Sequence, residues 1–309
     1  MEVKTIVTIL FLSMLGLSLG ANASTISSDE PWVDATEGIT GGSTAITWFP
    51  ANQNSSSSST LDHAQTIIEV YTATWCETCI PAEEALNASI TDHAVKVVKY
   101  HRHLFETEDP FGNNNTEGRW LSRYGPSAVQ ADFNARTPPT VIFGGERMHI
   151  GSHPTAGVSL EEEYSISLNS IMRPPISNSS EFTFTWEDGT FEWSWNWEED
   201  ITACRSNCDT VSTELYMMIV EDTAFFPEGS NGEEYYHRIL RDVIPLGNNS
   251  IEYILPQAWD DDDVSILIVL DWQESQSEET FLEVIPSLAV ELVIPVSYTH
   301  LTLPTRKLV

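Results

Sequence analysis

Basic residues are scarce in this sequence. Lysine and arginine together number 14, against 46 aspartate and glutamate residues, so the 309-residue chain carries a formal net charge of −32 at pH 7. A chain this acidic repels the phosphate backbone of nucleic acids and the anionic headgroups of a membrane surface. The composition therefore argues against both partners and indicates a highly soluble protein.

Long hydrophobic runs are missing after the first twenty residues. Lys4 precedes an apolar run over 6–19, and Ala21-Asn22-Ala23 follows it as a small-x-small cleavage pattern. This order predicts a signal peptide over 1–23 and a protein exported from the cytoplasm. An uncleaved anchor is the alternative, although the run is short for a membrane span.

Cysteines are also few, and the four fall in two close pairs, Cys76/Cys79 and Cys204/Cys208. Trp75-Cys76-Glu77-Thr78-Cys79 follows an apolar strand pattern and opens a helical one. Two cysteines three residues apart in a first helical turn bring their sulfurs within disulfide range, and the helix dipole stabilises a thiolate there. We therefore expect Cys76 to be the catalytic nucleophile and Cys79 the resolving thiol.

Two other interpretations of this pair stay open: a permanent structural disulfide, or half of a zinc site. Zinc needs two further ligands, and no second close cysteine pair lies in this part of the sequence. His101 and His103 are expected to be solvated loop histidines. We expect no metal and no organic cofactor.

A second motif lies sixty residues downstream, where Pro138-Pro139 precedes the apolar segment 140–143. Proline is poorly placed in the centre of a sheet, but a cis bond here would turn the chain and present an unpaired backbone edge. An extended peptide can pair with such an edge. Trp75, Pro138 and Pro139 are therefore the predicted substrate groove.

Together these motifs resemble the thioredoxin-like superfamily over residues 64–173. The resemblance implies an α/β thioredoxin fold in which Cys76 attacks, Cys79 resolves and Pro139 borders the substrate. Many thioredoxins carry a buried acid six residues before the first cysteine, where this sequence has Val70. The neighbouring Glu69 is a candidate proton shuttle, although strand alternation points it to the other face of the sheet unless the strand is bulged.

Beyond Pro175 the pattern changes to strict alternation over 182–186 and 191–195, with Glu187-Asp188-Gly189 as a hairpin turn. The pattern predicts an all-β, immunoglobulin- or fibronectin-like sandwich over 176–296, whose aromatic side chains pack its core. The arrangement is similar to outer-membrane proteins that join a thioredoxin-like domain to a fibronectin-like β-sandwich. Cys204 and Cys208 are expected to form a structural disulfide there, with a second redox pair as the alternative.

The remaining segments are assigned by composition. Residues 24–63 are polar, with a serine run, and are predicted to be a linker that includes at most one strand at 45–49. Residues 297–309 resemble translated sequencing-adapter read-through and are expected to be non-native. The natural chain would then continue past Val296, where a membrane anchor remains an open alternative.

The function predicted from the sequence is an exported thiol–disulfide oxidoreductase that exchanges disulfides with protein substrates and an unidentified redox partner. The expected location is secreted or extracytoplasmic, with attachment to the cell surface as a finer alternative. The rival hypothesis is a non-catalytic surface binding or adhesion module. In that case Cys76–Cys79 would be a fixed structural disulfide.

Overall fold

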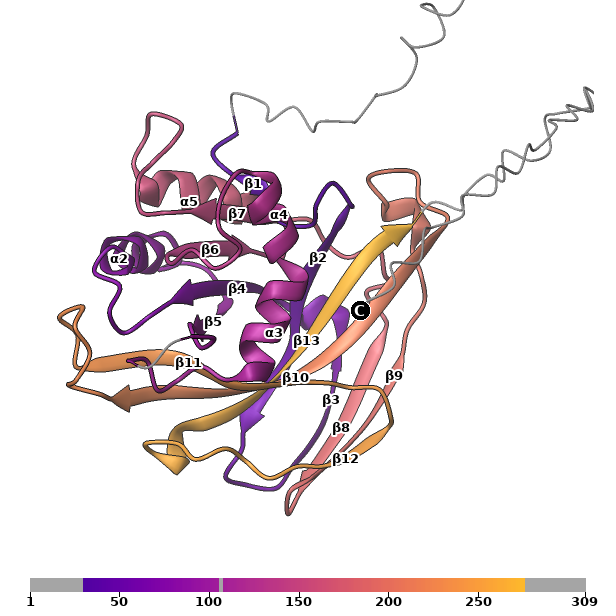
Figure 1. The fold of residues 1–309 in the computed structure, drawn as a ribbon. Helices are drawn as coiled ribbons and strands as arrows, with labels where there is room; N and C mark the ends of the chain where they lie inside the picture. Colours follow the sequence, from indigo (N-terminus) through magenta and orange to yellow (C-terminus); the bar gives the residue numbers. More distant parts are fainter. Residues whose placement is uncertain (1–29, 106–107, 276–309) are drawn as a thin grey trace, which may run out of the picture. The chain divides into compact units, whose positions relative to one another are not determined.

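The computed structural model describes residues 30–105 and 108–275. This part of the chain is mainly β, with thirteen strands and four α helices (Figure 1). The predicted signal peptide (1–23) and the predicted non-native tail (297–309) lie outside it. The strands are β1 (Val33–Asp34), β2 (Gly41–Pro50), β3 (Ser55–Thr60), β4 (Gln65–Thr72), β5 (Val95–His101), β6 (Thr140–Phe143), β7 (Arg147–Ile150), β8 (Glu181–Glu187), β9 (Thr190–Asn196), β10 (Thr210–Phe225), β11 (Tyr235–Pro245), β12 (Ser250–Glu252) and β13 (Val264–Ser275).

The helices are short. They are α2 (Cys79–Ser89), α3 (Asn114–Arg123), α4 (Gly125–Gln130) and α5 (Leu160–Asn169), with 3-10 turns η1 (Leu61–His63), η2 (Ile201–Ala203) and η3 (Asp261–Asp263). Within the described ranges, none of the helices combines the length and hydrophobicity needed to cross a membrane.

One nine-stranded sheet contains strands from both halves of the chain. Its order is β1-β7-β6-β4-β2-β13-β10-β11-β5, and β5 also pairs in parallel with β4. Because of that extra pairing, the six strands β4, β2, β13, β10, β11 and β5 form a closed ring of neighbours. The ring is joined most weakly at two places: β2 and β4 pair at two positions, and β11 and β5 at one.

The predicted fold class, an α/β thioredoxin fold followed by a separate all-β sandwich, is wrong. Strands from 64–173 and from 176–275 hydrogen-bond within the same sheet, so the expected break near Pro175 is not a break in the sheet. Long antiparallel strands dominate it: β10 pairs with β13 over twelve registered positions. The segments 140–143, 182–186 and 191–195 do form strands, but β1, β3 and β11 were not predicted, and neither was the pairing between the two halves of the chain.

The predicted linker over 24–63 is also corrected. It contains β2, which joins β4 to β13 in the large sheet, and β3, which pairs with β8 through six residues. The serine run that suggested flexibility is strand β3 itself, mostly exposed on the edge of the smaller sheet. Strand β2 is buried along most of its length because Ala45, Ile46 and Phe49 enter the core.

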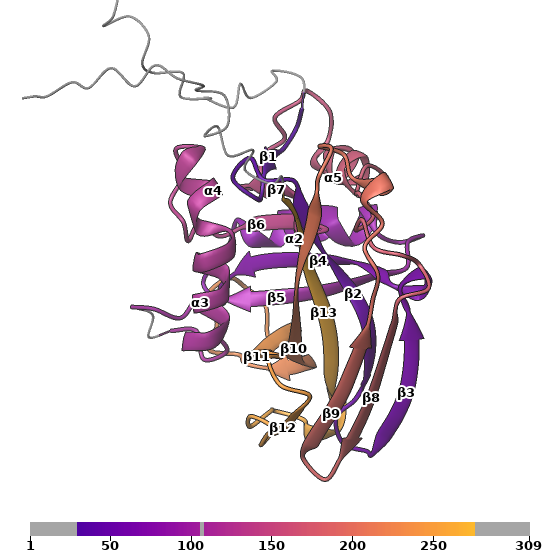
Figure 2. The ribbon, with the colours of Figure 1, turned by 90° about the vertical axis from the view of Figure 1, so that its right-hand side faces the viewer.

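The smaller sheet has the order β12-β9-β8-β3 and faces β2, β10 and β13 of the large one (Figure 2). The predicted β8–β9 hairpin is confirmed, and its turn residues Asp188 and Gly189 both have positive φ. Its aromatic side chains fill the layer between the sheets, as expected; Phe182 and Phe191 are fully buried, and Phe49 stacks on Phe184 with ring centroids 4.2 Å apart. A two-layer β packing is therefore present, but one of its layers is the large sheet.

Alternation along β4 separates the helices onto two faces. Ile68 and Val70 pack in one cluster with side chains of α2 and α5. Ile67 and Tyr71 pack on the opposite face with Trp120 and other side chains near α3. Residues 73–78 connect β4 to α2; this connection contains Cys76, and Cys79 is the first residue of the helix.

Candidate redox site

Cys76 and Cys79 form a disulfide at the start of α2, with an S–S distance of 2.05 Å and a Cα–Cα distance of 5.3 Å. The turn between them is held by the amide of Cys79, which donates to the carbonyl of Cys76 at 3.1 Å. Cys79 is fully buried and Cys76 is 4% exposed, whereas Glu77 and Thr78 between them are exposed. The pair thus lies just beneath the surface, at the helix end where the dipole favours negative charge.

Trp75 precedes the pair and packs with Ala73 against both cysteines. It is half-buried, and the guanidinium of Arg102 lies 5.6 Å from the centre of its ring. This places a cation next to the side chain that was predicted to border a substrate.

The backbone of Thr74 is anchored by residues from two distant parts of the chain. Its amide donates to Oδ2 of Asp109 at 2.8 Å, and its carbonyl accepts from the amide of Asn231 at 3.1 Å and from the hydroxyl of Tyr236 at 3.3 Å. Burial raises the pKa of Tyr236 to about 12, so its hydroxyl remains a donor at neutral pH. A Cβ on Gly229 would come within 3.0 Å of the same Thr74 carbonyl, so the β10–β11 loop passes close to the backbone there.

His101 is corrected from a solvated loop histidine to a buried one. It is 1% exposed, and its Nδ1 lies 2.8 Å from Oδ2 of Asp109, the oxygen that also accepts from Thr74. Its ring contacts Phe111 and Tyr236 edge-on. Asp109, His101 and Tyr236 therefore form one buried group behind the segment that leads to Cys76. His103, the other histidine of the pair, is half-buried.

The two predicted groove prolines lie at the neighbouring strand. The peptide bond between Pro138 and Pro139 is cis, and Pro139 is buried while Pro138 is half-buried. Tyr71 of β4 pairs with Thr140 of β6, so continuing the antiparallel register puts Pro139 opposite Thr72. Both prolines thus lie at the end of the sheet from which the Cys76 loop departs.

Glu69 does not serve the cysteines. Its carboxylate accepts from the hydroxyl of Tyr100 at 2.6 Å and from the hydroxyl of Tyr124, and it lies 3.3 Å from Nη2 of Arg119. These partners occupy the α3 face of β4, whereas Cys79 belongs to α2 on the other face. The proton-shuttle hypothesis is therefore wrong, because β4 has no bulge at Glu69 that would turn the side chain over.

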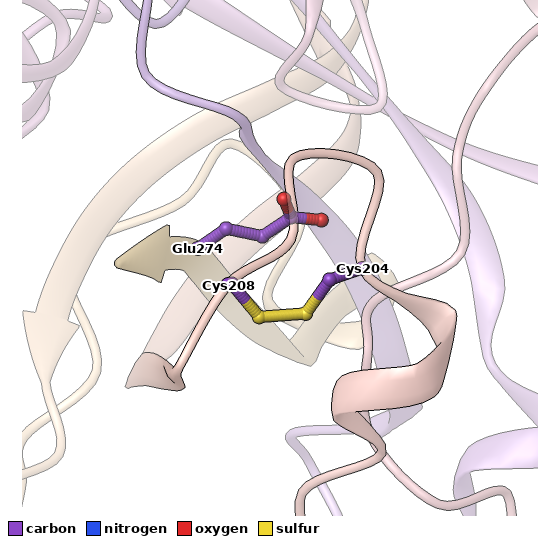
Figure 3. Close-up of side chains that lie close together, drawn as sticks. All are labelled: Cys204, Cys208 and Glu274. Carbon is purple, nitrogen blue, oxygen red and sulfur yellow. A yellow bond between two sulfur atoms is a disulfide. The ribbon is translucent and has the colours of Figure 1, made fainter. Parts of the chain in front are cut away.

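The second cysteine pair is also joined: Cys204 and Cys208 form a disulfide in the loop before β10 (Figure 3). Glu274 of β13 lies beside it, and these three side chains have the spacing of a candidate metal site. The donor set does not fit a metal, because both sulfurs are bonded to each other. The carboxylate of Glu274 already accepts from the amides of Arg205 and Ser206 at 2.9 and 3.0 Å.

Comparisons with known proteins give no family. No family model matches the chain, and no curated protein matches it. Among solved structures, protein AGR_C_4864 from Agrobacterium tumefaciens matches at 15% identity and a TM-score of 0.38, over 66% of this chain and 77% of that one. HBP35 of Porphyromonas gingivalis matches at 13% identity and a TM-score of 0.33, over 67% of this chain and 63% of its own, which is less than two thirds of its length.

The predicted membership of the thioredoxin-like superfamily is corrected accordingly. The fold is mainly β, its sheet continues far beyond the strands that carried the resemblance, and no family model supports the assignment. The site must therefore be judged on its own chemistry. The site consists of a disulfide between two cysteines three residues apart, at a helix N-terminus, with exposed residues between them.

Sequence reasoning missed Asp109, Asn231 and Tyr236. The first follows Glu108 in a polar segment, and the other two belong to the loop and strand after β10, 155 or more residues from Cys76 along the chain. The only local signals for these residues were the motifs Asp109-Pro110-Phe111 and Tyr235-Tyr236. Neither motif indicates a contact with the cysteine segment unless the strand pairing is known.

Proposed function

We propose that this chain is a thiol–disulfide oxidoreductase that exchanges disulfides with protein substrates through Cys76 and Cys79. The observation that carries the proposal is the position of the bond at the first residue of α2. The reduced form would place a Cys76 thiolate near the positive end of the helix dipole, which lowers the cost of ionising it. The exposed Glu77 and Thr78 leave this turn in contact with solvent.

The exchange needs no metal or organic cofactor. A client thiolate attacks Sγ of Cys76, the Cys76–Cys79 bond breaks, and Cys79 leaves as a thiolate, so that a mixed disulfide with Cys76 remains. A second client thiol then attacks the client sulfur of that mixed disulfide. The products are an oxidised client and a reduced Cys76/Cys79 pair, and the reverse sequence reduces a client disulfide.

A location outside the cytoplasm agrees with the two disulfides among the described residues, because cytosolic thiols are kept reduced. Attachment to the cell surface is the finer part of the proposal. Labelling of intact cells with a membrane-impermeant biotin reagent tests it. Surface attachment is ruled out if the protein is recovered only from the medium.

A second candidate function is the non-catalytic surface binding or adhesion module, with Cys76–Cys79 as a permanent disulfide. The 4% exposure of Cys76 favours this alternative, because an attacking thiolate must reach its sulfur. The two functions differ in the reduction potential that they require. Exchange enzymes lie at roughly −270 to −120 mV, whereas structural disulfides of secreted proteins lie below about −300 mV.

The deciding experiment is a glutathione redox titration of the purified chain, with the Cys76–Cys79 state followed by alkylation and mass spectrometry. It is paired with an insulin disulfide-reduction assay. We expect a potential within the exchange range and a loss of insulin reduction in Cys76→Ser. The matched control is the double variant Cys204→Ser/Cys208→Ser, which should retain activity. A bond that glutathione does not open would reject the enzyme and leave the structural role.

A further inference from the structure

A cavity of about 540 Å³ opens on the closed ring of strands, away from the disulfide loop. Its walls come from five strands of the ring and from the C-terminal end of α2. The side chains that matter for its chemistry are Trp48 of β2, Lys96 and Val98 of β5, Val220 of β10, Arg238 of β11 and Leu267 of β13.

The cavity exists because the ring is weakly joined on this side. β5 and β11 share one registered pair, Lys99 with Ile239, and β2 and β4 are paired at Ala45 with Gln65 and at the adjoining position. Beyond those pairs the strands diverge, and side chains rather than backbone hydrogen bonds line the space between them. Openings at the end of a curved sheet are common positions for small-ligand sites.

Two cations face this space in a chain that has few. Among the described residues, neither Lys96 nor Arg238 forms an ion pair. Nζ of Lys96 lies 3.7 Å from the ring centre of Trp48, and Nη1 of Arg238 lies 3.5 Å from Oδ1 of Asn87. An aromatic face and an amide oxygen attract a cation without neutralising it. The one carboxylate in the lining, Asp222, is solvent-exposed.

The C-terminal carbonyls of α2 do not account for these cations. Cations often stabilise a helix C-terminus by approaching its last carbonyls. Here the carbonyl of Leu86 accepts from the Ile90 amide and the Ser89 hydroxyl, while Thr91 donates its hydroxyl to the carbonyls of Asn87 and Ala88. The helix end is thus satisfied by its own residues, and Lys96 and Arg238 are left without a carboxylate.

The rest of the lining is apolar apart from Thr91, His93 and Ser265. Val98 and Leu267 are 1% and 3% exposed and form the floor, while the indole of Trp48 is 52% exposed at the rim. A ligand for such a site needs an anionic end and an apolar body. Inorganic anions lack the apolar body, and neutral lipids lack the charge.

We propose that this cavity binds a small organic carboxylate with an apolar chain. The carboxylate lies between Lys96 and Arg238, where the guanidinium offers paired N–H donors. The chain lies against Trp48 and the floor formed by Val98 and Leu267. This site is separate from the disulfide, so the proposal stands or falls independently of the proposed exchange function.

Isothermal titration calorimetry with octanoate, octan-1-ol and inorganic phosphate tests the proposal on the unmodified protein. Octanoate should bind, and both the alcohol and phosphate should bind at least about tenfold more weakly, a factor that corresponds to 1.4 kcal/mol. The proposal is overturned if octanoate gives no binding or if octan-1-ol binds as tightly.

Variants then assign the cations. Lys96→Gln and Arg238→Gln should each weaken octanoate binding about tenfold or more, and Lys96→Arg should largely retain it. Arg173→Gln removes the same charge from an exposed position outside the cavity and should leave the affinity unchanged. Equal losses in Arg173→Gln and Arg238→Gln would mean that only net charge matters, and the site would be rejected.

Discussion

Arg119 of α3 and Asp271 of β13 form a buried bidentate ion pair, although 152 residues separate them. Nη1 lies 2.7 Å from Oδ2 and Nη2 lies 3.2 Å from Oδ1. Arg123 adds a second cation 2.9 Å from Oδ2, and the hydroxyl of Ser43 donates to Oδ1 at 2.7 Å. Burial acts to raise the pKa of Asp271, but the two guanidinium groups hold it below its usual value. The pair ties the helix of the predicted first domain to a strand of the predicted second one.

Asp271→Asn should therefore destabilise the described fold as a whole. It leaves two buried guanidinium groups without their shared carboxylate, and breaking a buried ion pair from one side typically costs about 3–5 kcal/mol. Urea denaturation followed by tryptophan fluorescence and by circular dichroism measures the loss. We expect one shifted transition with both probes.

The control for this change is Asp92→Asn, which removes one charge from an exposed position and should leave the free energy of unfolding within about 0.5 kcal/mol. Two separate unfolding transitions, of which Asp271→Asn shifts only one, would contradict the single-sheet fold. That outcome would restore two independent domains.

Local patterns were enough to predict many of the strands. The alternating aromatics over 182–186 and 191–195 became β8 and β9, and the apolar run over 140–143 became β6. Strand β3 was missed because its serine-rich sequence has the composition of a linker. It is a strand because β8 supplies hydrogen-bond partners along its whole length, and tertiary pairing overrides weak local preference.

The candidate site likewise combines residues that the sequence predicted with residues that it did not predict. A Cys-x-x-Cys spacing after a strand is a local signal, and the structure joins those two residues. The groups that anchor Thr74 are not local: Asp109 is 35 residues away and Tyr236 is 162. Asp109 follows β5, the parallel neighbour of β4, whereas Tyr236 reaches Thr74 because β11 joins the same sheet, and no pattern near Cys76 encodes either pairing.

Stability should fall as the pH drops below about 6.5 because of His149. Burial, with a smaller contribution from Arg147, lowers its pKa to about 3, and its Nε2 lies 2.7 Å from the Ser167 hydroxyl. Between pH 6.5 and 3 the unfolded chain takes up a proton that the folded chain does not, so this residue costs about 1.4 kcal/mol of stability per pH unit.

Comparison of chemical denaturation at pH 7.5 and 5.5 in the parent protein and in His149→Gln isolates this effect. The variant should lose less stability than the parent between the two pH values, by about 1.4 kcal/mol. Nδ1 of His149 lies 4.0 Å from the Glu163 carboxylate. If the parent became more stable at pH 5.5 relative to the variant, a charged His149–Glu163 pair would be indicated instead.

Glu69→Gln should leave the pH–rate profile of disulfide exchange unchanged, because its carboxylate faces Tyr100, Tyr124 and Arg119 rather than the cysteines. It should lower the free energy of unfolding by about 1–3 kcal/mol, since buried donors lose a charged acceptor. Insulin reduction between pH 6 and 9, together with urea denaturation, measures both quantities.

Asp109→Asn is the matched comparison, because Asp109 accepts from the Thr74 amide and from His101. We expect this variant to slow exchange by about tenfold, because loss of the bond to Thr74 displaces the segment before Cys76 and so misplaces the reacting sulfur. A shifted pH–rate profile in Glu69→Gln, together with an unchanged exchange rate in Asp109→Asn, would contradict both assignments.

Glu77 should make the Cys76–Cys79 pair less oxidising than it would be with a neutral residue at this position. Its exposed carboxylate lies in the turn between the two cysteines, where it repels a Cys76 thiolate and so disfavours the reduced form. Glu77→Gln removes that repulsion and should raise the reduction potential by about 5–20 mV, which corresponds to the free energy of about 0.2–1 kcal/mol typical of an exposed charge pair. Glu84→Gln, about two turns beyond Glu77 in α2 and also exposed, is the control and should change the potential less. Because the repulsion is electrostatic, the difference between the parent and Glu77→Gln should shrink at 1 M salt, where the Debye length is about 3 Å. A lower potential in Glu77→Gln than in the parent protein, or a difference that salt does not alter, would show that Glu77 acts on the disulfide through something other than its charge.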